Sequence, residues 1–295
     1  MTDGQLVIEP LANEGDDMSN DLRDARTAHL VTHQARYDRM LGPFGDAMLA
    51  AARLRRGERV VDVGCGTGAT TVAAARAVGG TGRVMAIDLD ESLVRHAADR
   101  CAGAGLANVD AVCGDAASYP YAAGGADVVI SRFATMLFAD PVAAHANLRR
   151  ALGPDGRLCA VVWQAVERNL WHALPMAAVF AHVERGPQLH DSPEPAGPFA
   201  FASPTRVERI LFDAGFVDIE LEALHDDLWV ASDSDDAIAF FDDDAGSALR
   251  SAYGVDTVLR IYDDLRRDLE PYATRDGIRL RAAAWLVTAR ARSRW

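Results

Sequence analysis

Hydrophobic runs alternate with amphipathic segments through the first half of the chain. Short apolar runs rich in Val, Ile and Ala predict buried strands, and apolar residues recurring every three or four positions predict helices between them. The expected strands are Arg59–Val63, Arg83–Ile87, Val109–Cys113, Ala126–Ser131 and Arg157–Trp163. The expected helices are Thr70–Val78, Glu91–Gly103 and Pro141–Leu152. Such alternation predicts a parallel sheet with helices on both faces.

The segments on either side of this alternation are less regular. Before it, we expect a helix over Asp21–Met40, an interruption at Pro43 and a second helix over Phe44–Leu54. After it, Gln164–Gly186 is helix-rich, and the prolines of 186–204 indicate a loop that we interpret as a lid. The remaining expected elements are helix Thr205–Ala214, strand Val217–Ala223, helix Asp256–Leu269 and strand Ala282–Arg290; Gly153–Gly156 is an expected turn.

A glycine-dense turn follows the first expected strand. Gly64, Gly66 and Gly68 cost chain entropy, and the usual reason for such a cluster is that the backbone approaches a ligand closely at the carboxyl end of a strand. Asp88 stands 20 residues after Gly68, at the end of the second expected strand. An α/β nucleotide-binding fold places at that point the carboxylate that binds the ribose hydroxyls.

The spacing of the turn restricts the identity of the nucleotide. It is G-x-G-x-G, which differs from the G-x-G-x-x-G of dinucleotide enzymes, and no Gly-Lys-Ser/Thr follows to form a phosphate loop. Asp62, just before the turn, would repel a diphosphate but suits an ammonium or a sulfonium group. S-adenosylmethionine carries both of these cations and a ribose.

The stretch Val61–Gly68 resembles, residue for residue, the first motif of class I S-adenosylmethionine-dependent methyltransferases. The resemblance implies a Rossmann-like α/β fold: a mostly parallel seven-stranded sheet whose last strand runs antiparallel beside the fifth, with helical cap elements. Further stretches look like the ubiquinone/menaquinone-methyltransferase-like branch of bacterial small-molecule enzymes. They are Ser131–Phe133, Asp140–Pro141, Asn147–Leu152, Trp163, Pro198–Ala202 and Trp285–Arg290.

The resemblance also assigns roles to individual residues. Asp115 would accept a hydrogen bond from the adenine amino group, with Ala116 supplying backbone; the alternative is a turn aspartate that caps a short helix. The residues expected to bind S-adenosylmethionine, or its product S-adenosylhomocysteine, are Asp62, Gly64, Cys65, Gly66, Gly68, Asp88, Leu89, Asp115, Ala116 and Ser131.

Residues around the methyl acceptor are expected from several segments. Tyr37, Arg132, Met136 and Trp171 are candidates for substrate contacts, although Met136 taken alone is more typical of a core position. A hydroxyl acceptor needs a base, for which His33 and His172 are the candidates; both also suit ordinary packing or solvent-exposed positions.

These assignments divide the chain into five parts. We expect a flexible N-terminal segment, helices that cap the cofactor, a cofactor-binding core, a cap or lid insertion, and the rest of the sheet with a helical insertion. Their boundaries are 1–20, 21–56, 57–163, 164–204 and 205–295.

Composition and charge fit a cytoplasmic bacterial enzyme. With 49% hydrophobic and 25% charged residues the chain has the composition of an ordinary globular protein, and its net charge of -13 argues against nucleic acid and anionic membranes as partners. The four cysteines lack C-x-x-C spacing, so we expect reduced thiols and no zinc. No secretory leader or membrane-spanning run is apparent. The acidic stretch Asp226–Asp244 lacks the spacing of a calcium loop and suits a solvated face.

The sequence therefore predicts an S-adenosylmethionine-dependent methyltransferase that acts on a small-molecule acceptor as a monomer or homodimer. Methyl transfer would be an in-line displacement onto an O, N or C nucleophile. Two alternatives stay open: a nicotinamide-dependent oxidoreductase on a related fold, and a noncatalytic S-adenosylmethionine-binding protein.

Overall fold

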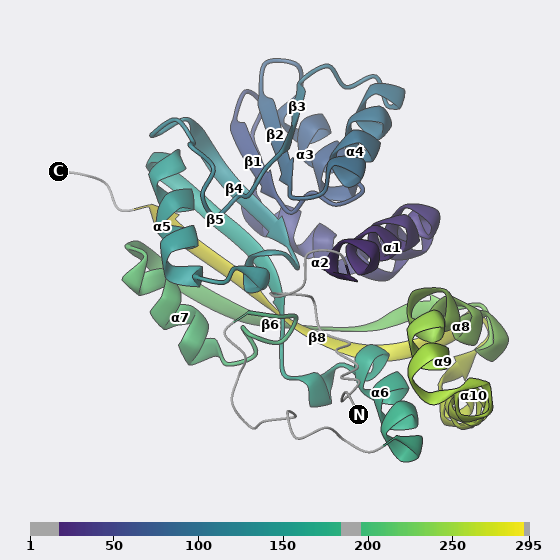
Figure 1. Ribbon diagram of the computed structural model, residues 1–295. Helices are drawn as coiled ribbons and strands as arrows, with labels where there is room; N and C mark the ends of the chain where they lie inside the picture. The colour runs from purple at the N-terminus through teal and green to yellow at the C-terminus, as the bar shows by residue number, and fades with distance from the viewer. Residues whose placement is uncertain (1–17, 184–195, 292–295) are drawn as a thin grey trace. The chain divides into compact units, whose positions relative to one another are not determined.

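The computed structural model describes residues 18–183 and 196–291, which form two compact units (Figure 1). The larger unit contains residues 30–164, 196–224 and 284–291; the smaller contains residues 18–29, 165–183 and 225–283. Helix α1 (Met18–Thr32) and the long strands β6 (Phe216–Ala231) and β8 (Gly277–Ala291) contribute residues to both units. Most of the expected N-terminal segment, and the stretch 184–195 of the expected lid, lie outside the described residues.

The strands form one sheet in the order β3-β2-β1-β4-β5-β8-β6, and the short β7 (Ala273–Thr274) pairs with β8. The other bounds are β1 Arg59–Val63, β2 Arg83–Asp88, β3 Val109–Cys113, β4 Ala126–Arg132 and β5 Leu152–Trp163. Pairing is parallel from β3 through β5, whereas β8 runs antiparallel to β5 with Trp163 opposite Ala284. The expected mostly parallel sheet, with an antiparallel last strand beside the fifth, is confirmed.

Helices of the larger unit cover this sheet. Helix α2 (Gln34–Ala52) packs on β4 and β5, α3 (Ala69–Val78) on β1 and β2, and α4 (Glu91–Gly103) on β2 and β3. Helices α5 (Pro141–Ala151) and α7 (Pro204–Asp213) pack on each other, away from α3 and α4 (Figure 1). The side chains of Val84, Ile87 and Ile130 on the central strands are fully buried, and burial of this kind is the main driving force for folding.

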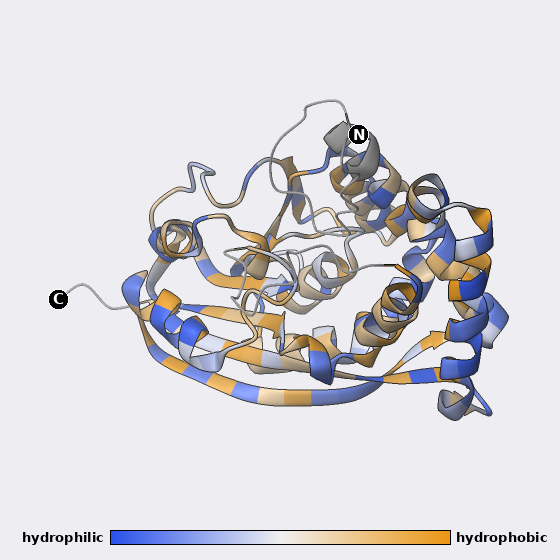
Figure 2. Cartoon of the chain, turned by 60° about the horizontal axis from the view of Figure 1, so that its bottom comes forward, coloured by the Kyte–Doolittle hydropathy of each residue, from blue (hydrophilic) through white to orange (hydrophobic). Residues whose placement is uncertain are grey.

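Hydropathy follows the same arrangement. Blue and orange residues alternate along the long strands in Figure 2, and hydrophilic residues cover much of the helices. Strand β6 alternates between exposed and partly buried positions over most of its length, as a strand with one solvated face does.

Several strands are longer than the sequence predicted. Strand β5 begins at Leu152, and the expected turn Gly153–Gly156 is an irregularity within it, because Leu152 pairs with Ala126 whereas Arg157 pairs with Val128. Strand β6 continues eight residues past the predicted end at Ala223, into the acidic stretch, and β8 begins at Gly277 instead of Ala282. The hydrophobic pattern of a strand ends where turn residues or charges appear, but hydrogen bonding to a neighbouring strand can extend the strand beyond that point.

The prediction that Pro43 interrupts the N-terminal helices is wrong. Helix α2 runs through Pro43, and the break falls earlier, at His33. A proline inside a helix removes one backbone hydrogen bond. Here Phe44 and Met48 on the same helix are fully buried, and Phe44 packs edge-on against Trp163 with ring centroids 5.5 Å apart. We attribute the continuity of the helix to this tertiary packing.

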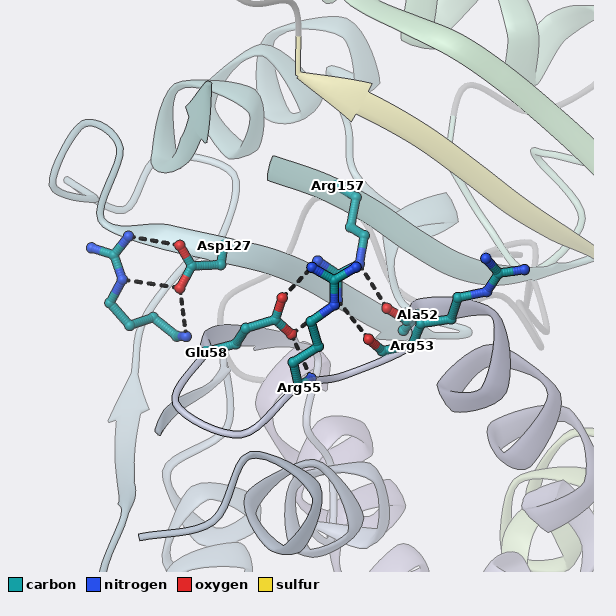
Figure 3. A network of polar contacts seen from close by, with 7 residues as sticks. Ala52, Arg53, Arg55, Glu58, Asp127 and Arg157 are labelled. Carbon is teal, nitrogen blue, oxygen red and sulfur yellow. Dashed lines mark hydrogen bonds and ion pairs between the residues drawn. The ribbon is translucent and has the colours of Figure 1, made fainter. Parts of the chain in front are cut away.

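A network of charged groups joins the end of α2 to the start of β1 (Figure 3). The Arg157 guanidinium donates to both carboxylate oxygens of Glu58, at 3.0 and 2.9 Å, and to the carbonyl oxygens of Ala52 and Arg53, at 2.6 and 3.1 Å. The αL conformation of Arg53 (φ 47°) ends the helix. Arg157 thus satisfies two helix-terminal carbonyls and pairs with Glu58, whose pKa is lowered.

The described part of the smaller unit is mostly helical. It contains α6 (Leu170–His182), α8 (Ser234–Phe241), a π-helical turn (Asp242–Gly246), α9 (Ser247–Tyr253) and α10 (Val255–Leu269), which packs on α6. The buried Asn169 amide donates to the carbonyls of Ala165 and Ala283 and accepts from the Ala283 N–H and the Trp171 indole. One side chain therefore satisfies both backbone groups of Ala283 on β8.

The acidic stretch is partly structural. Asp233 caps α8 by accepting from the Asp236 N–H at 2.9 Å, and Asp242 accepts hydrogen bonds from Arg250 and Tyr262. Asp233 thus caps a single helix, whereas Asp242 joins the π-helical turn to α9 and α10. Within the described ranges, no group of three or more His, Cys, Asp or Glu side chains is arranged to hold a metal ion, and no helix has the length and hydrophobicity needed to cross a membrane.

Burial of His145 on α5 makes the stability of the larger unit depend on pH. Its Nδ1 donates to the Pro141 carbonyl at 2.7 Å, its ring lies against Phe201, and burial lowers its pKa to about 4 from 6.5. As the pH falls from about 6.5 to about 4, the unfolded chain binds a proton that the folded chain does not. The free energy of unfolding should therefore decrease, by about 3 kcal/mol over the whole window.

Urea unfolding of wild type and His145→Phe across that window measures this effect. The variant should lose about 1.4 kcal/mol per pH unit from the slope of stability against pH. The matched control is His225→Gln, because His225 is exposed in the fold. Equal slopes for wild type and His145→Phe would contradict the assignment.

Candidate functional site

The glycine turn after β1 is held by backbone hydrogen bonds. Gly64, Gly66 and Gly68 have φ angles of 66°, 52° and 86°, in the left-handed region that favours glycine. The N–H groups of Gly64 and Cys65 donate to the Ile87 carbonyl on β2, at 2.9 and 3.2 Å, and the Gly68 N–H donates to the Cys65 carbonyl at 2.9 Å. The turn is therefore already formed by contacts within the chain.

The three glycines have different surroundings. A Cβ on Gly64 would stand 2.2 Å from the Ala134 Cβ, and one on Gly68 would stand 2.9 Å from the Ala97 Cβ. A Cβ on Gly66 would meet no atom of the described residues within 4 Å. Gly64 and Gly68 are thus required by packing, whereas Gly66 borders open space, as expected for backbone that faces a ligand.

Asp62 is fully buried directly below this turn. Its Oδ2 accepts from the hydroxyls of Thr70 and Thr71, at 2.8 and 2.7 Å, while its Oδ1 has no hydrogen-bond partner among the described residues. Burial raises the pKa of Asp62, an effect that the two hydroxyl donors oppose. Since an unsatisfied buried acceptor costs about 1–3 kcal/mol, Oδ1 is suited to a donor supplied by a ligand.

Asp88 borders the same turn from the end of β2. Its Oδ2 accepts from the Gly66 N–H at 2.9 Å, and its Oδ1 accepts from the Asp90 N–H at 3.2 Å. Burial raises its pKa, and the bond from Gly66 opposes that shift. The next side chain, Leu89, is 65% exposed. A carboxylate of fixed orientation thus lies beside an exposed apolar side chain. The carboxylate suits the hydroxyls of a ribose, and the apolar side chain suits the attached base.

The segment after β3 matches the alternative that the sequence left open for Asp115. Its carboxylate accepts from the Ala117 N–H and the Ser118 hydroxyl, both at 2.9 Å, which is a turn-capping arrangement. Asp115 is nevertheless exposed, so its oxygens retain free lone pairs, and Ala116 beside it is buried. Its contact with adenine stays a prediction.

Residues at the end of β4 occupy three different environments. Ser131 is fully buried and donates to the Val63 carbonyl at 2.9 Å, which ties β4 to β1. Met136 is also buried, at 3% exposure, as a core residue is. Arg132 is half-buried, and its guanidinium makes a long hydrogen bond, 3.4 Å, to the Leu41 carbonyl on α2.

Phe133 follows in a strained conformation. Its φ of 60° is a genuine outlier for a bulky side chain. The ring stacks on Trp163, with centroids 3.7 Å apart and planes within 9°, and meets Phe44 edge-on. Because this bend seats Ala134 against Gly64, the aromatic cluster fixes the turn after β4 on the turn after β1. Strain of this kind concentrates at functional sites.

Helix α2 is tied to the glycine turn. Asp38 pairs with Arg100 of α4 at 2.6 Å, and Arg100 also donates to the Thr67 carbonyl at 3.2 Å. Tyr37 and His33 lie at the start of α2, both half-buried, and the Tyr37 N–H donates to the His33 carbonyl. These two candidates therefore belong to the same unit as the glycine turn.

Two candidates belong to the smaller unit. Trp171 and His172 on α6 meet edge to face, with ring centroids 5.5 Å apart, and the Trp171 indole donates to Asn169. Burial lowers the pKa of His172. A lowered pKa favours the neutral imidazole, the form that accepts a proton.

Sequence reasoning did not identify all the residues that build the site. Thr70 and Thr71 hold Asp62, and Gly45 of α2 makes room for the Arg132 side chain. The signals were present: two hydroxyl residues directly after the glycine turn, and a glycine inside a predicted helix, which often marks a close approach. The Phe133–Trp163 stack could not be predicted from a local pattern, because Phe133 follows β4 and Trp163 ends β5.

Comparison with known proteins agrees with this geometry. Residues 60–156 match the model of the methyltransferase domain family. The chain is 33% identical to nocamycin O-methyltransferase of Saccharothrix syringae over 203 residues, 66% of this chain and 71% of that enzyme. It is 34% identical to the ubiquinone/menaquinone biosynthesis C-methyltransferase of Burkholderia vietnamiensis over 124 residues, which is 41% of this chain and 51% of that enzyme.

Solved structures show the same fold. A putative methyltransferase from Bacillus halodurans C-125 aligns with a TM-score of 0.56 at 22% identity, covering 84% of this chain and 98% of that one. Phosphoethanolamine N-methyltransferase 2 of Haemonchus contortus, in complex with phosphomonomethylethanolamine and S-adenosylhomocysteine, aligns with a TM-score of 0.56 at 18% identity, covering 92% and 61%. The chain belongs to the class I S-adenosylmethionine-dependent methyltransferases, and it is an enzyme of that class.

The residues present fit S-adenosylmethionine. Gly66 leaves room for the ligand, Asp62 offers an unsatisfied acceptor to an ammonium, and Asp88 is oriented for a ribose. Each feature corresponds to one part of the donor molecule.

The substitution Gly66→Ala tests whether the open space belongs to the ligand. A methyl group at position 66 would occupy that space without touching protein atoms, so we expect at least tenfold weaker binding of S-adenosylhomocysteine by calorimetry. The left-handed φ should cost only about 1–2 kcal/mol of stability. The matched comparison is Gly64→Ala, whose clash with Ala134 should lower the melting temperature much further. Undiminished binding by Gly66→Ala would place the ligand elsewhere.

Proposed function

We propose that this enzyme transfers a methyl group from S-adenosylmethionine to a small organic acceptor. The observation that carries the proposal is the preformed turn between Asp62 and Asp88, with open space at Gly66 and an unsatisfied carboxylate oxygen beneath it. The nocamycin O-methyltransferase and the ubiquinone/menaquinone C-methyltransferase support an acceptor of small-molecule size, methylated on oxygen by the first enzyme and on carbon by the second.

Bound S-adenosylmethionine supplies an electrophilic methyl group on a sulfonium sulfur. The chain's own contribution is to hold the donor in one orientation. In the proposed site Asp62 takes the ammonium, the glycine turn carries the methionine end, Asp88 binds the ribose, and Leu89, Asp115 and Ala116 surround the adenine. Gly64, Cys65, Gly68 and Ser131 hold the backbone of this cradle. Rigid placement of the reactants is a large part of catalysis in such displacements.

The acceptor decides whether a base is needed. An amine or a stabilised carbanion needs deprotonation and alignment, whereas a hydroxyl needs a proton acceptor in the site. His33 and His172 are the proposed candidates for that acceptor, and Tyr37, Arg132, Met136 and Trp171 are the proposed substrate contacts. Burial lowers the pKa of His172, so its imidazole is held in the neutral form that can accept a proton.

Removal of the ribose carboxylate tests the proposed site. Asp88→Ala should weaken S-adenosylhomocysteine binding by roughly 1–3 kcal/mol, as expected for the loss of a hydrogen-bonded charge. Methyl transfer from labelled donor to a panel of phenols, carboxylic acids, amines and enolisable carbonyl compounds should fall in parallel. Asp110→Ala is the matched control, because Asp110 on β3 forms an exposed pair with Arg83.

Three results would contradict the proposal in different ways. Unchanged affinity in Asp88→Ala would remove Asp88 from the site. Binding of S-adenosylhomocysteine with no transfer to any acceptor would favour a noncatalytic binding protein. Tight binding of a nicotinamide dinucleotide, with none of S-adenosylhomocysteine, would favour an oxidoreductase.

A further inference from the structure

The guanidinium of Arg132 lies beside helix α2, in space left by a glycine. A Cβ on Gly45 would stand 3.3 Å from the Arg132 Nη1 and 3.4 Å from its Cδ. Glycine in a helix interior costs about 1 kcal/mol relative to alanine. Helix α2 therefore has its destabilising glycine at the position that contacts the Arg132 side chain.

Among the described residues this guanidinium has no carboxylate partner. Within the described ranges its one hydrogen bond is the long contact with the Leu41 carbonyl, and no ion pair within 4.0 Å joins it to any residue there. Asp38, a nearby carboxylate, is already paired with Arg100 at 2.6 Å. Burial lowers the pKa of Arg132, and the charge of Asp62 opposes that shift. A desolvated arginine without a counterion is costly unless a ligand supplies the anion.

Arg132 and Asp62 project on the same side of the sheet. Asp62 of β1 is the register partner of Ile130 on the parallel strand β4. Side chains two residues apart on a strand share a face, so Arg132 lies on the side of Asp62, about 7 Å further toward the carboxyl edge. In the part of the chain that the structure describes, Asp62 Oδ1 accepts no hydrogen bond and the Arg132 guanidinium contacts no anion. A carboxylate and a guanidinium placed one after the other along this face could bind the ammonium and the carboxylate of an amino acid.

We propose that Arg132 binds the α-carboxylate of the donor's methionine moiety, beside the ammonium held at Asp62. This inference rests on the proposed donor site and gives Arg132 a role toward the donor in place of the acceptor. It makes Arg132 a binding residue that selects donors with an intact amino-acid end.

Two ligands that differ only at that end test the role. S-adenosylhomocysteine carries the amino acid, whereas 5′-methylthioadenosine lacks it. In calorimetry, Arg132→Met should bind S-adenosylhomocysteine at least tenfold more weakly than wild type and 5′-methylthioadenosine equally well. The affinity of Arg132→Lys for S-adenosylhomocysteine should lie between those of wild type and Arg132→Met, because lysine keeps the charge without the bidentate guanidinium geometry. Arg83→Met, which removes an exposed guanidinium from the start of β2, is the control and should change neither affinity.

A measurement on the wild-type protein covers the case in which Arg132→Met does not fold. The carboxamide of S-adenosylhomocysteine should bind at least tenfold more weakly than the carboxylate. Equal affinity for the two would overturn the inference, as would equal losses of both ligands in the variants. If Arg132→Met keeps its affinity for S-adenosylhomocysteine but has a raised KM for the methyl acceptor, Arg132 contacts the acceptor and not the donor. If wild type binds neither S-adenosylhomocysteine nor 5′-methylthioadenosine, the donor site itself is wrong.

Discussion

The site depends on one buried carboxylate. Asp62 is fully buried at the end of β1, where two threonine hydroxyls donate to one carboxylate oxygen and no described residue donates to the other. A buried charge is tolerated only where hydrogen bonds or an opposite charge offset its desolvation. Half of that requirement is met by the start of α3. In the proposed site a cationic ligand supplies the other half, which would link the fold and the choice of donor through the same residue.

The backbone around Asp62 is fixed from both sides. Bonds from the glycine turn to Ile87 hold it to β2, and Ala134 presses on Gly64 because the stacked Phe133 bends the chain after β4. Arg100 joins the turn to Asp38 on α2. Because the turn is held rigidly, the space beside Gly66 stays open for a ligand. A pre-organised site of this kind spends little binding energy on ordering itself.

Much of this arrangement was predictable, for identifiable reasons. The five parallel strands and their helices have strong local patterns, and the glycine turn with Asp62 and Asp88 is a local motif. Elements that depend on distant partners were not predictable in the same way: β6 extends into an acidic stretch by pairing, and α2 crosses Pro43 because Phe44 packs on Trp163. Likewise, Arg132 has no ion-pair partner among the described residues because Asp38 pairs with Arg100, and sequence spacing does not reveal that pairing.

The most direct test of the central claim is a crystal structure of the complex with S-adenosylhomocysteine. We expect the homocysteine end of the ligand to lie over Gly66 with its ammonium directed toward Asp62, and the ribose hydroxyls of the adenosine to contact Asp88. A glycine turn closed over by its own side chains, or the adenosine bound at another edge of the sheet, would contradict the account.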